Sequence, residues 1–301
     1  MTRERSMVPE AEFRSYYGRP VLKAPVWHEP HMPIYLYVGG VSGVSSVMAV
    51  MAGFTGHDRL ARTARVAAAL GAAVGAGLLA AELGRPSRFL NMLRVFKPSS
   101  PMSVGSWTLA AQGGLSVVAA STELTGILPA VGDAAVLATG LTGPLTATYT
   151  AVLIADTAVP AWHEAYRELP FLFAGSALAS AGAVGMLATP RAQAGPARVV
   201  AVIGAAVESV AGMVMERRLG LVGEPYRLGK AGRLMLSARV LTAGGGLLAA
   251  VAGRGRALTA LSGLALTAGA LCTRFGILEA GRASAADPKY TVVPQRQRLD
   301  T

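Results

Sequence analysis

Histidine, tyrosine and tryptophan gather in the stretch 27–37, just before and within a long apolar run. Trp27, His28 and His31 precede the run, and Tyr35 and Tyr37 follow within it. Imidazole titrates near neutral pH and a phenol hydroxyl donates a hydrogen bond, so this combination suits a polar ligand that exchanges protons. His31 and Tyr35 are four residues apart and would share one face of a helix.

This chemistry is that of a quinone pocket, which needs a hydrogen-bond partner at each carbonyl, a proton donor and apolar walls. We expect His28 or His31, with Tyr35 beside them, to serve one carbonyl of menaquinone or ubiquinone. Tyr149, late in another apolar run, would serve the second carbonyl, and Glu82 would supply or receive protons.

Two plainer interpretations stay open. Tryptophan and tyrosine favour the edge of a membrane because they are amphipathic, whether or not a ligand binds there. Asp156 follows an apolar run and would either feed protons to the same site or be a solvated acid at a helix end.

The segments that would position these residues are long and apolar. Of the 301 residues 52% are hydrophobic and 15% are charged, where soluble proteins have about a quarter charged. Residues 104–121 and 170–189 hold no acid or base, and each is about long enough to cross ~30 Å of hydrocarbon as a helix. Alternating ~10-residue segments, which membrane strands need, do not occur. We predict an all-α membrane protein with eight transmembrane helices, at 32–54, 63–83, 104–121, 134–156, 170–189, 197–216, 232–252 and 257–279.

A tryptophan–histidine–glutamate motif occurs twice, with its tryptophans 135 residues apart, at Trp27-His28-Glu29 and Trp162-His163-Glu164. Such self-similarity indicates duplicated halves. With four spans each, the halves run in the same direction, which predicts parallel repeats forming two four-helix bundles. The predicted domains are a polar N-terminal segment (1–31), a first bundle with the quinone site (32–156), a second bundle (157–280) and a polar C-terminal tail (281–301).

Three ionisable residues fall inside the spans of the second half. Glu208, Arg239 and Arg274 would each cost about 2.5–3.5 kcal/mol at the centre of a bilayer, so they should face the protein interior and find partners. One interpretation is a structural ion pair of Glu208 with Arg239 or Arg274. The other is a proton path or a water-filled cavity.

Lysine and arginine are distributed unevenly among the predicted loops. The side carrying both termini holds 19 of them, the opposite loops hold 7, and two lie inside spans. Cytoplasmic loops are enriched in these residues, so we predict an inner-membrane protein with both termini in the cytoplasm. The net charge of +11 is then a topology signal that also attracts the lipid bilayer, and nucleic-acid binding is not expected.

No metal, haem or iron–sulfur cluster is expected in this chain. Its four histidines all lie outside the middle of the spans, where axial ligands of a membrane haem would have to be. Cys272 is the single cysteine, too few to hold a cluster. A redox role must therefore use electrons delivered by another subunit.

The stretch from Glu82 to Trp107 carries the most specific motifs. Glu82-Leu-Gly-Arg-Pro is followed, after an aromatic and basic stretch, by Ser-Pro-Met and Gly-Ser-Trp107. Together with Tyr149-Thr-Ala-Val-Leu and Ala158-Val-Pro-Ala-Trp162, these motifs resemble the NrfD-like family, also called the polysulfide reductase membrane subunit family. The resemblance covers most of the chain.

The resemblance implies eight membrane helices in two bundles, no bound haem, and a quinone site in the first bundle that uses His28 or His31, Tyr149 and Glu82. Members of the family usually pair with a ferredoxin-like iron–sulfur subunit and often with a molybdopterin catalytic subunit. The flanks Tyr16–Lys23 and Pro288-Lys289-Tyr290 resemble a branch often linked to formate dehydrogenase.

We therefore interpret the chain as the membrane anchor and quinone-reactive subunit of a multisubunit oxidoreductase. It would exchange electrons between an iron–sulfur cluster of a partner and the quinone pool. A transporter or proton channel is the competing class, because parallel repeats and intramembrane charges fit it too. A purely structural membrane anchor is the third class.

Overall fold

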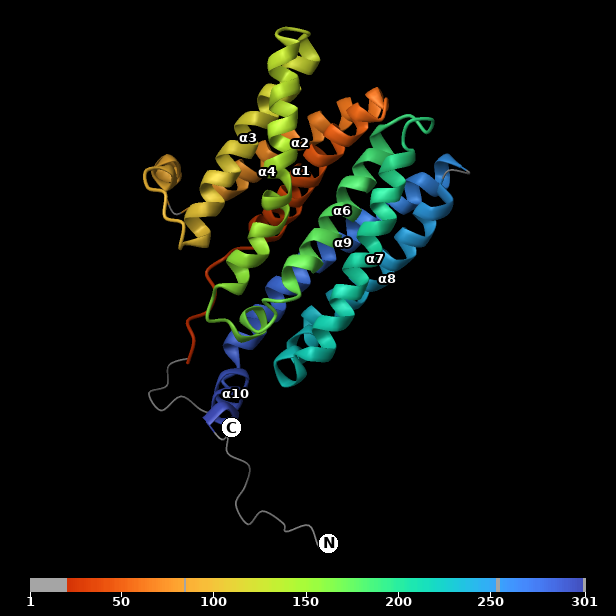
Figure 1. The fold of residues 1–301 in the computed structure, drawn as a ribbon. Helices are drawn as coiled ribbons and strands as arrows, with labels where there is room; N and C mark the ends of the chain where they lie inside the picture. The colour runs from red at the N-terminus through yellow and green to blue at the C-terminus, as the bar shows by residue number, and fades with distance from the viewer. Residues whose placement is uncertain (1–20, 84, 253–254, 300–301) are drawn as a thin grey trace, which may run out of the picture.

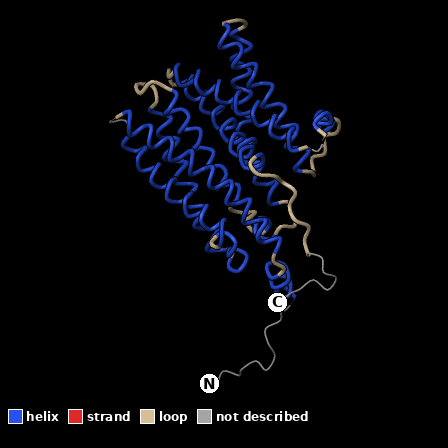
Figure 2. The backbone as a smooth tube through the Cα atoms, turned by 180° about the vertical axis from the view of Figure 1, so that it is seen from behind, coloured by secondary structure: helices blue, strands red, loops and turns tan. Residues whose placement is uncertain are grey.

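The computed structural model describes residues 21–83, 85–252 and 255–299, and helices account for most of them (Figures 1 and 2). These residues contain no strand, which confirms the all-α prediction. Most of the predicted N-terminal segment, including Tyr16–Pro20 of the first flanking motif, lies outside the described residues.

Eight long helices form the body of the described chain. The first four are α1 (His31–Phe54), α2 (Asp58–Glu82), α3 (Pro101–Thr125) and α4 (Pro129–Ala155). The second four are α6 (Leu169–Ala188), α7 (Gly195–Arg218), α8 (Gly229–Val251) and α9 (Arg256–Ala286). Shorter elements are the 3₁₀ helices η1 (Pro86–Leu93) and η2 (Gly220–Tyr226), and the helices α5 (Pro160–His163) and α10 (Lys289–Leu299).

Within the described residues, seven of the long helices are long and apolar enough to cross a membrane, and α3 is not among them. The chain is thus a multi-pass membrane protein, while a count of eight crossings stays a prediction. The α3 helix carries the buried Gln112, whose amide donates to Ser46 Oγ on α1 over 2.6 Å. Thr142 Oγ1 on α4 donates to the Gln112 carbonyl over 2.5 Å. The polar Gln112 thus contributes to the lower hydropathy of α3, and its hydrogen bonds join α3 to α1 and α4.

The long helices pack as two adjoining sets. In the first set α1 contacts α2 and α4, and α3 contacts both α2 and α4; α6 to α9 form the same kind of ring. The sets meet where α6 lies against α1 and α4, and where α9 lies against α1 (Figure 1). Within the first set, a Cβ on Gly43 of α1 or Gly143 of α4 would overlap the backbone of the facing helix. Glycine at these two positions therefore permits the close approach of α1 and α4. That the sets are sequence repeats with the predicted domain limits stays a prediction.

Prolines and caps fix where several helices begin and end. Proline stands in the first turn of α3, α4, α6 and α7, where its missing N–H would have no partner inside the helix, at Pro101, Pro129, Pro170 and Pro196. The Ser100 side chain caps α3, and Gly126 ends α3 with a φ of 70°, a conformation that favours glycine.

Most of the candidate functional residues lie at one end of the molecule. Short loops make successive helices antiparallel, so the starts of α1 and α3 lie at the same end as the last turns of α2 and α4. The segment 21–30 and α10 lie at this end as well (Figure 1). We call it the terminal end.

An ion pair fastens α10 to η2 at the terminal end. Lys289 Nζ lies 3.1 Å from Glu224 Oε2, and the Tyr290 hydroxyl donates to the same oxygen over 3.2 Å. The hydrogen bond from Lys289 lowers the pKa of the Glu224 carboxyl, and the carboxylate in turn raises the pKa of Lys289. The pair therefore contributes stability above the ordinary pKa of a glutamate, loses it as pH falls through the lowered pKa, and loses it again in strong alkali.

Candidate functional site

A cavity of about 230 Å³ opens at the terminal end of the first helix set. Its walls come from the segment 21–30 and from α1, α2, η1, α3 and α4. Most of the wall is apolar, and the lining residues are Val26, Trp27, Met32, Tyr35, Leu79, Glu82, Leu83, Met92, Met102, Gly105, Ser106, Tyr149 and Leu153. An apolar pocket into which a few polar groups converge is typical of a small-molecule site. We call it the head cavity.

Two phenols on different helices meet at its wall. The hydroxyls of Tyr35 on α1 and Tyr149 on α4 are hydrogen-bonded to each other, although 114 residues separate them in the chain. Tyr35 is buried and Tyr149 is half-buried. Gly105 on α3 makes room for this arrangement, because a Cβ there would overlap the Tyr149 ring. Each hydroxyl retains acceptor capacity and can turn toward a polar ligand.

Glu82, the last residue of α2, is the only acidic side chain among the described residues of the lining. Its Oε1 accepts a hydrogen bond from the backbone N–H of His28 over 2.6 Å and lies 3.2 Å from His28 Nδ1. Its Oε2 is buried without a hydrogen bond and lies 3.6 Å from His31 Nδ1. The carboxylate is 12% exposed, while the side chains of His28 and His31 are 72% and 43% exposed. The two imidazoles thus connect a buried carboxylate to the surface.

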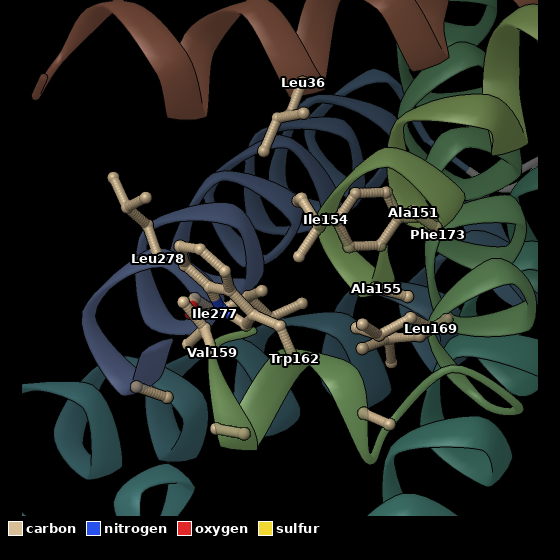
Figure 3. Packing of buried hydrophobic residues seen from close by; sticks show 14 of the residues in the cluster. Leu36, Ala151, Ile154, Ala155, Val159, Trp162, Leu169, Phe173, Ile277 and Leu278 are labelled. Atoms are coloured by element: carbon tan, nitrogen blue, oxygen red, sulfur yellow. Dashed lines mark hydrogen bonds between the residues drawn. The ribbon is translucent and has the colours of Figure 1, made fainter. Parts of the chain in front are cut away.

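The two copies of the tryptophan–histidine–glutamate motif come into contact beside this cavity. Trp27, on the cavity wall, stacks on Trp162 of α5 with ring centroids 5.2 Å apart. Trp162 is fully buried and its indole N–H donates to the Ile277 carbonyl of α9 over 2.7 Å. Figure 3 shows this indole packed among Val159, Ile277 and Leu278. A wall of the first-half cavity therefore rests on a fixed side chain of the second half.

Charged groups of the second half complete the attachment of the segment 21–30. Arg282 Nη2 on α9 donates to the Trp27 carbonyl over 2.5 Å, and its Nη1 lies 3.3 Å from Glu29 Oε1. Lys230 Nζ on α8 lies 3.2 Å from Glu29 Oε2 and 3.1 Å from Glu279 Oε1. These cations hold the residues on either side of His28, and so fix the backbone N–H that binds Glu82.

Other candidate residues lie outside the head cavity. Asp156 is exposed directly after α4 and is not among the lining residues, as the interpretation of a solvated acid expects. His57 caps the start of α2 at the opposite end, 3.0 Å from Thr55 Oγ1. His163 Nδ1 lies 3.0 Å from the Ala155 carbonyl oxygen. Tyr37 lines a different pocket, between α1, α2 and α6.

The buried Glu208 is held by hydroxyl groups. Thr273 Oγ1 on α9 donates to its Oε1 over 2.6 Å, and Thr242 Oγ1 on α8 donates to its Oε2 over 3.4 Å. The Glu208 residue is 5% exposed and ties α7 to α8 and α9. Its carboxylate therefore has hydrogen-bond partners without a direct ion pair among the residues described.

The predicted pairing of Glu208 with Arg239 is wrong, because the guanidinium of Arg239 bonds to Glu216 Oε1 over 2.5 Å. Arg239 lies on a partly exposed face of α8 and reaches Glu216, which is about two turns beyond Glu208 on α7. Arg274 is buried and lies 3.7 Å above the Phe173 ring, and its Nη2 donates to the Phe173 carbonyl over 3.2 Å. Its Nε and Nη1 have no hydrogen-bond partner among the described residues.

Several residues of the cavity wall were not predicted from the sequence. Met92, Met102 and Gly105 carry no acid–base chemistry, so nothing in their type pointed to a site. Met102 and Gly105 do belong to the Ser-Pro-Met and Gly-Ser-Trp motifs, which was the available signal. Flexible methionines suit a wall that must adapt to a ligand.

In the described part of the chain, no group of three or more His, Cys, Asp or Glu side chains is arranged to hold a metal ion. Compared with protein families, the chain matches the NrfD-type model described as polysulfide reductase over residues 13–287. No curated protein matches it significantly.

The attachment of the segment 21–30 can be tested without any ligand. Arg282→Gln removes the charged donor to the Trp27 carbonyl and the ion pair with Glu29, so the segment should loosen. We expect trypsin to cut after the exposed Lys23 several-fold faster than in the unaltered protein. Arg233→Gln, at an exposed position of α8, is the matched control and should leave the rate unchanged. Equal cleavage rates in all three proteins would contradict the assigned role of Arg282.

Proposed function

Because the chain belongs to the polysulfide reductase family of NrfD type, we propose that its head cavity binds the ring of a quinone and exchanges electrons with it on behalf of a partner subunit. Members of this family are membrane subunits that interact with quinones in oxidoreductase complexes. The observation that carries the proposal is the convergence of Tyr35, Tyr149 and Glu82 in one apolar cavity.

The polar groups of the cavity match the two ends of a quinone ring. One carbonyl would accept from the Tyr149 hydroxyl, with Tyr35 holding that phenol in place through the existing hydrogen bond. The other carbonyl would accept a hydrogen bond from the His31 imidazole, or from Glu82 when its carboxyl carries a proton, since Oε2 makes no hydrogen bond to the described residues. Menaquinone and ubiquinone both present carbonyls at opposite ends of the ring, so either would fit this description.

Quinone reduction takes up two electrons and two protons, and quinol oxidation releases them. The electrons would pass to or from an iron–sulfur cluster of a partner docked at the terminal end. The protons would move between the ring and Glu82, and from there to solvent through the exposed imidazoles of His28 and His31. Imidazole suits this step because it gains and loses a proton near neutral pH.

Family members pair with iron–sulfur and molybdopterin catalytic subunits, and we propose the same partners here, with formate dehydrogenase as one possible complex. The terminal end offers a basic surface beside the cavity, with Arg88, Arg94 and Lys97 around η1. Exposed Leu90 and Phe96 lie between these charges. Such a mixture suits docking of an acidic subunit at the membrane surface.

Substitutions in the cavity test the proposal in the isolated complex. The double variant His28→Ala/His31→Ala should abolish quinone-linked turnover and leave reduction of an artificial dye by the partner intact. Tyr149→Phe removes one donor worth roughly 0.5–1.5 kcal/mol, so the KM for quinone should rise about two- to tenfold. Glu82→Gln keeps the hydrogen bond but not the proton exchange, so kcat should fall by roughly 100-fold or more.

His57→Ala is the matched control, since His57 lies at the opposite end of α1 and α2. Unchanged quinone turnover in the double histidine variant would refute the site. The competing classes give other results: a transporter or proton channel should be isolated without redox partners and move a substrate. A structural anchor should bring its partner but keep full turnover in every cavity variant.

For the buried acid of the second half we propose a structural role, in which Glu208 joins α7 to α8 and α9 through Thr242 and Thr273. Its neighbour Arg274 contributes a fixed positive charge. The alternative to a structural role is a proton path through Glu208 and these neighbouring groups. Thr273→Val leaves the carboxyl able to titrate and removes a donor, which costs about 1–3 kcal/mol in a buried site.

The two possible roles of Glu208 predict different behaviour of the same two variants. If the role is structural, Glu208→Gln and Thr273→Val should both lower the thermal midpoint of the complex, and the assembled fraction should keep normal quinone turnover and charge movement. If Glu208 carries protons, Glu208→Gln should assemble normally and lose proton coupling, while Thr273→Val keeps it. Normal coupling together with normal stability in Glu208→Gln would contradict both.

We propose an inner-membrane location with the terminal end in the cytoplasm, on the strength of the 19-to-7 bias of lysine and arginine. A reporter fused after Thr301 that is active only in the cytoplasm should therefore be active. Activity of a periplasm-specific reporter at the same position would reverse the topology and move the docking face outward.

A further inference from the structure

A second cavity adjoins the head cavity in the first helix set. It measures about 380 Å³ and lies between α2 and α3, with η1 at one end. Three of its lining residues, Leu79, Met92 and Ser106, also line the head cavity. The two spaces are therefore neighbours that share a common wall. We call the second one the α2–α3 groove.

Small residues on both helices make this groove. On α2, Ala72 and Ala76 are four residues apart and lie on one face. On α3, Ala110 and Gly113 face them, with Val117 one turn further. Side chains this short leave a trough where larger ones would interlock. The Cβ of Ala72 is 3.8 Å from the position that a Cβ on Gly113 would take, so the two helices approach each other closely at these positions.

The η1 helix bridges the groove at the terminal end. Phe89 and Met92 are three residues apart, the spacing that brings side chains to one face of a 3₁₀ helix, and both line the groove. Arg88 and Asn91 are exposed. Ala110, Gly114 and Val117 are exposed along the outside of α3.

The groove offers a ligand almost no polar group. Ser106 has the single hydroxyl of its lining, and that hydroxyl already donates to the Met102 carbonyl over 2.8 Å. A further pocket shares Met92, Met102 and Ser106 with the head cavity, but the rest of its lining includes Asn91, Lys97 and serines. Of these two neighbours of the head cavity, the α2–α3 groove is therefore the one that suits a hydrocarbon chain.

Resting on the proposed function, we infer that the α2–α3 groove holds the isoprenoid tail of the quinone whose ring occupies the head cavity. The tail leaves the ring past Leu79 and Met92, runs between Ala76 and Gly113, and reaches the lipid beside Val117. Ala76 and Gly113 are then specificity-determining positions, which admit long tails because their side chains are short.

Tail-length dependence in the isolated complex tests this assignment. Gly113→Leu and Ala76→Leu fill the groove from opposite helices, so loss of folding in one variant leaves the other. With a quinone bearing a long isoprenoid tail, kcat/KM should fall at least tenfold in both variants. With an analogue bearing a single isoprene unit it should stay within twofold of the unaltered complex. Gly77→Leu, where a Cβ meets nothing within 4 Å, is the control and should change neither value.

The outcomes distinguish the assignment of the α2–α3 groove from the proposed quinone-ring site. An equal loss with both quinones, or no loss with either, would overturn the assignment of the groove while leaving the ring site standing. Native mass spectrometry gives a further outcome. If Gly113→Leu loses a bound phospholipid while the dependence of kcat/KM on tail length is unchanged, the groove holds an acyl chain, and its assignment to the quinone tail is overturned as well. If the unaltered complex reacts with neither quinone, the proposed function itself fails. Dye reduction by the partner and the yield of complex report assembly in every variant.

Discussion

The stack of Trp27 on Trp162 is the contact on which the geometry of the head cavity depends. Trp162 cannot move easily, because it is fully buried and its N–H is bonded to the backbone of α9. Trp27 therefore meets a rigid surface, and its carbonyl is fixed by Arg282. The next residue, His28, directs its backbone N–H to Glu82. One short extended segment thus links the second helix set, the cavity wall and the carboxylate at the end of α2.

Two polar side chains buried inside this membrane protein form hydrogen bonds between helices. Gln112 joins α3 to α1 and α4, and Glu208 joins α7 to α8 and α9. Such bonds replace water that the bilayer cannot supply. The exposed ion pairs of Lys230, Glu279 and Arg282 lie instead at the terminal end, where solvent weakens each pair and several together hold a segment in place.

The two cavities offer an amphiphilic ligand two different environments. The head cavity lies at the terminal end, where hydroxyl and carboxylate groups converge and imidazoles lead to solvent. The α2–α3 groove lies between apolar helix faces and is made by the absence of long side chains. A molecule with a polar ring and a hydrocarbon tail matches this division, because each part keeps the surroundings that it would prefer at a membrane surface.

Particular residues show which features of the fold could be predicted from the sequence. Charge-free apolar runs predicted the long helices, yet α2 begins at Asp58 rather than near 63, and α9 continues to Ala286 beyond the expected 279. Hydropathy marks only the part of a helix that lipid covers, whereas the last turns of α9 carry Arg282 in ion pairs. The pairing of Glu208 with Arg239 failed for a related reason: a span fixes the depth of a residue but not the rotation of its helix.

The sequence by itself determined the helical membrane class, the family motifs and the residue types of the site, because hydropathy and side-chain chemistry are local properties. It also marked Glu82, Tyr35 and Tyr149 as candidates, which the fold brings into one cavity from three helices. Only the tertiary structure decided that the two copies of the tryptophan motif stack on each other and that Thr242 and Thr273 hold Glu208. It also decided that small residues of α2 and α3 form a groove beside the cavity. These contacts depend on the rotation and close approach of helices, which many distant side chains fix together.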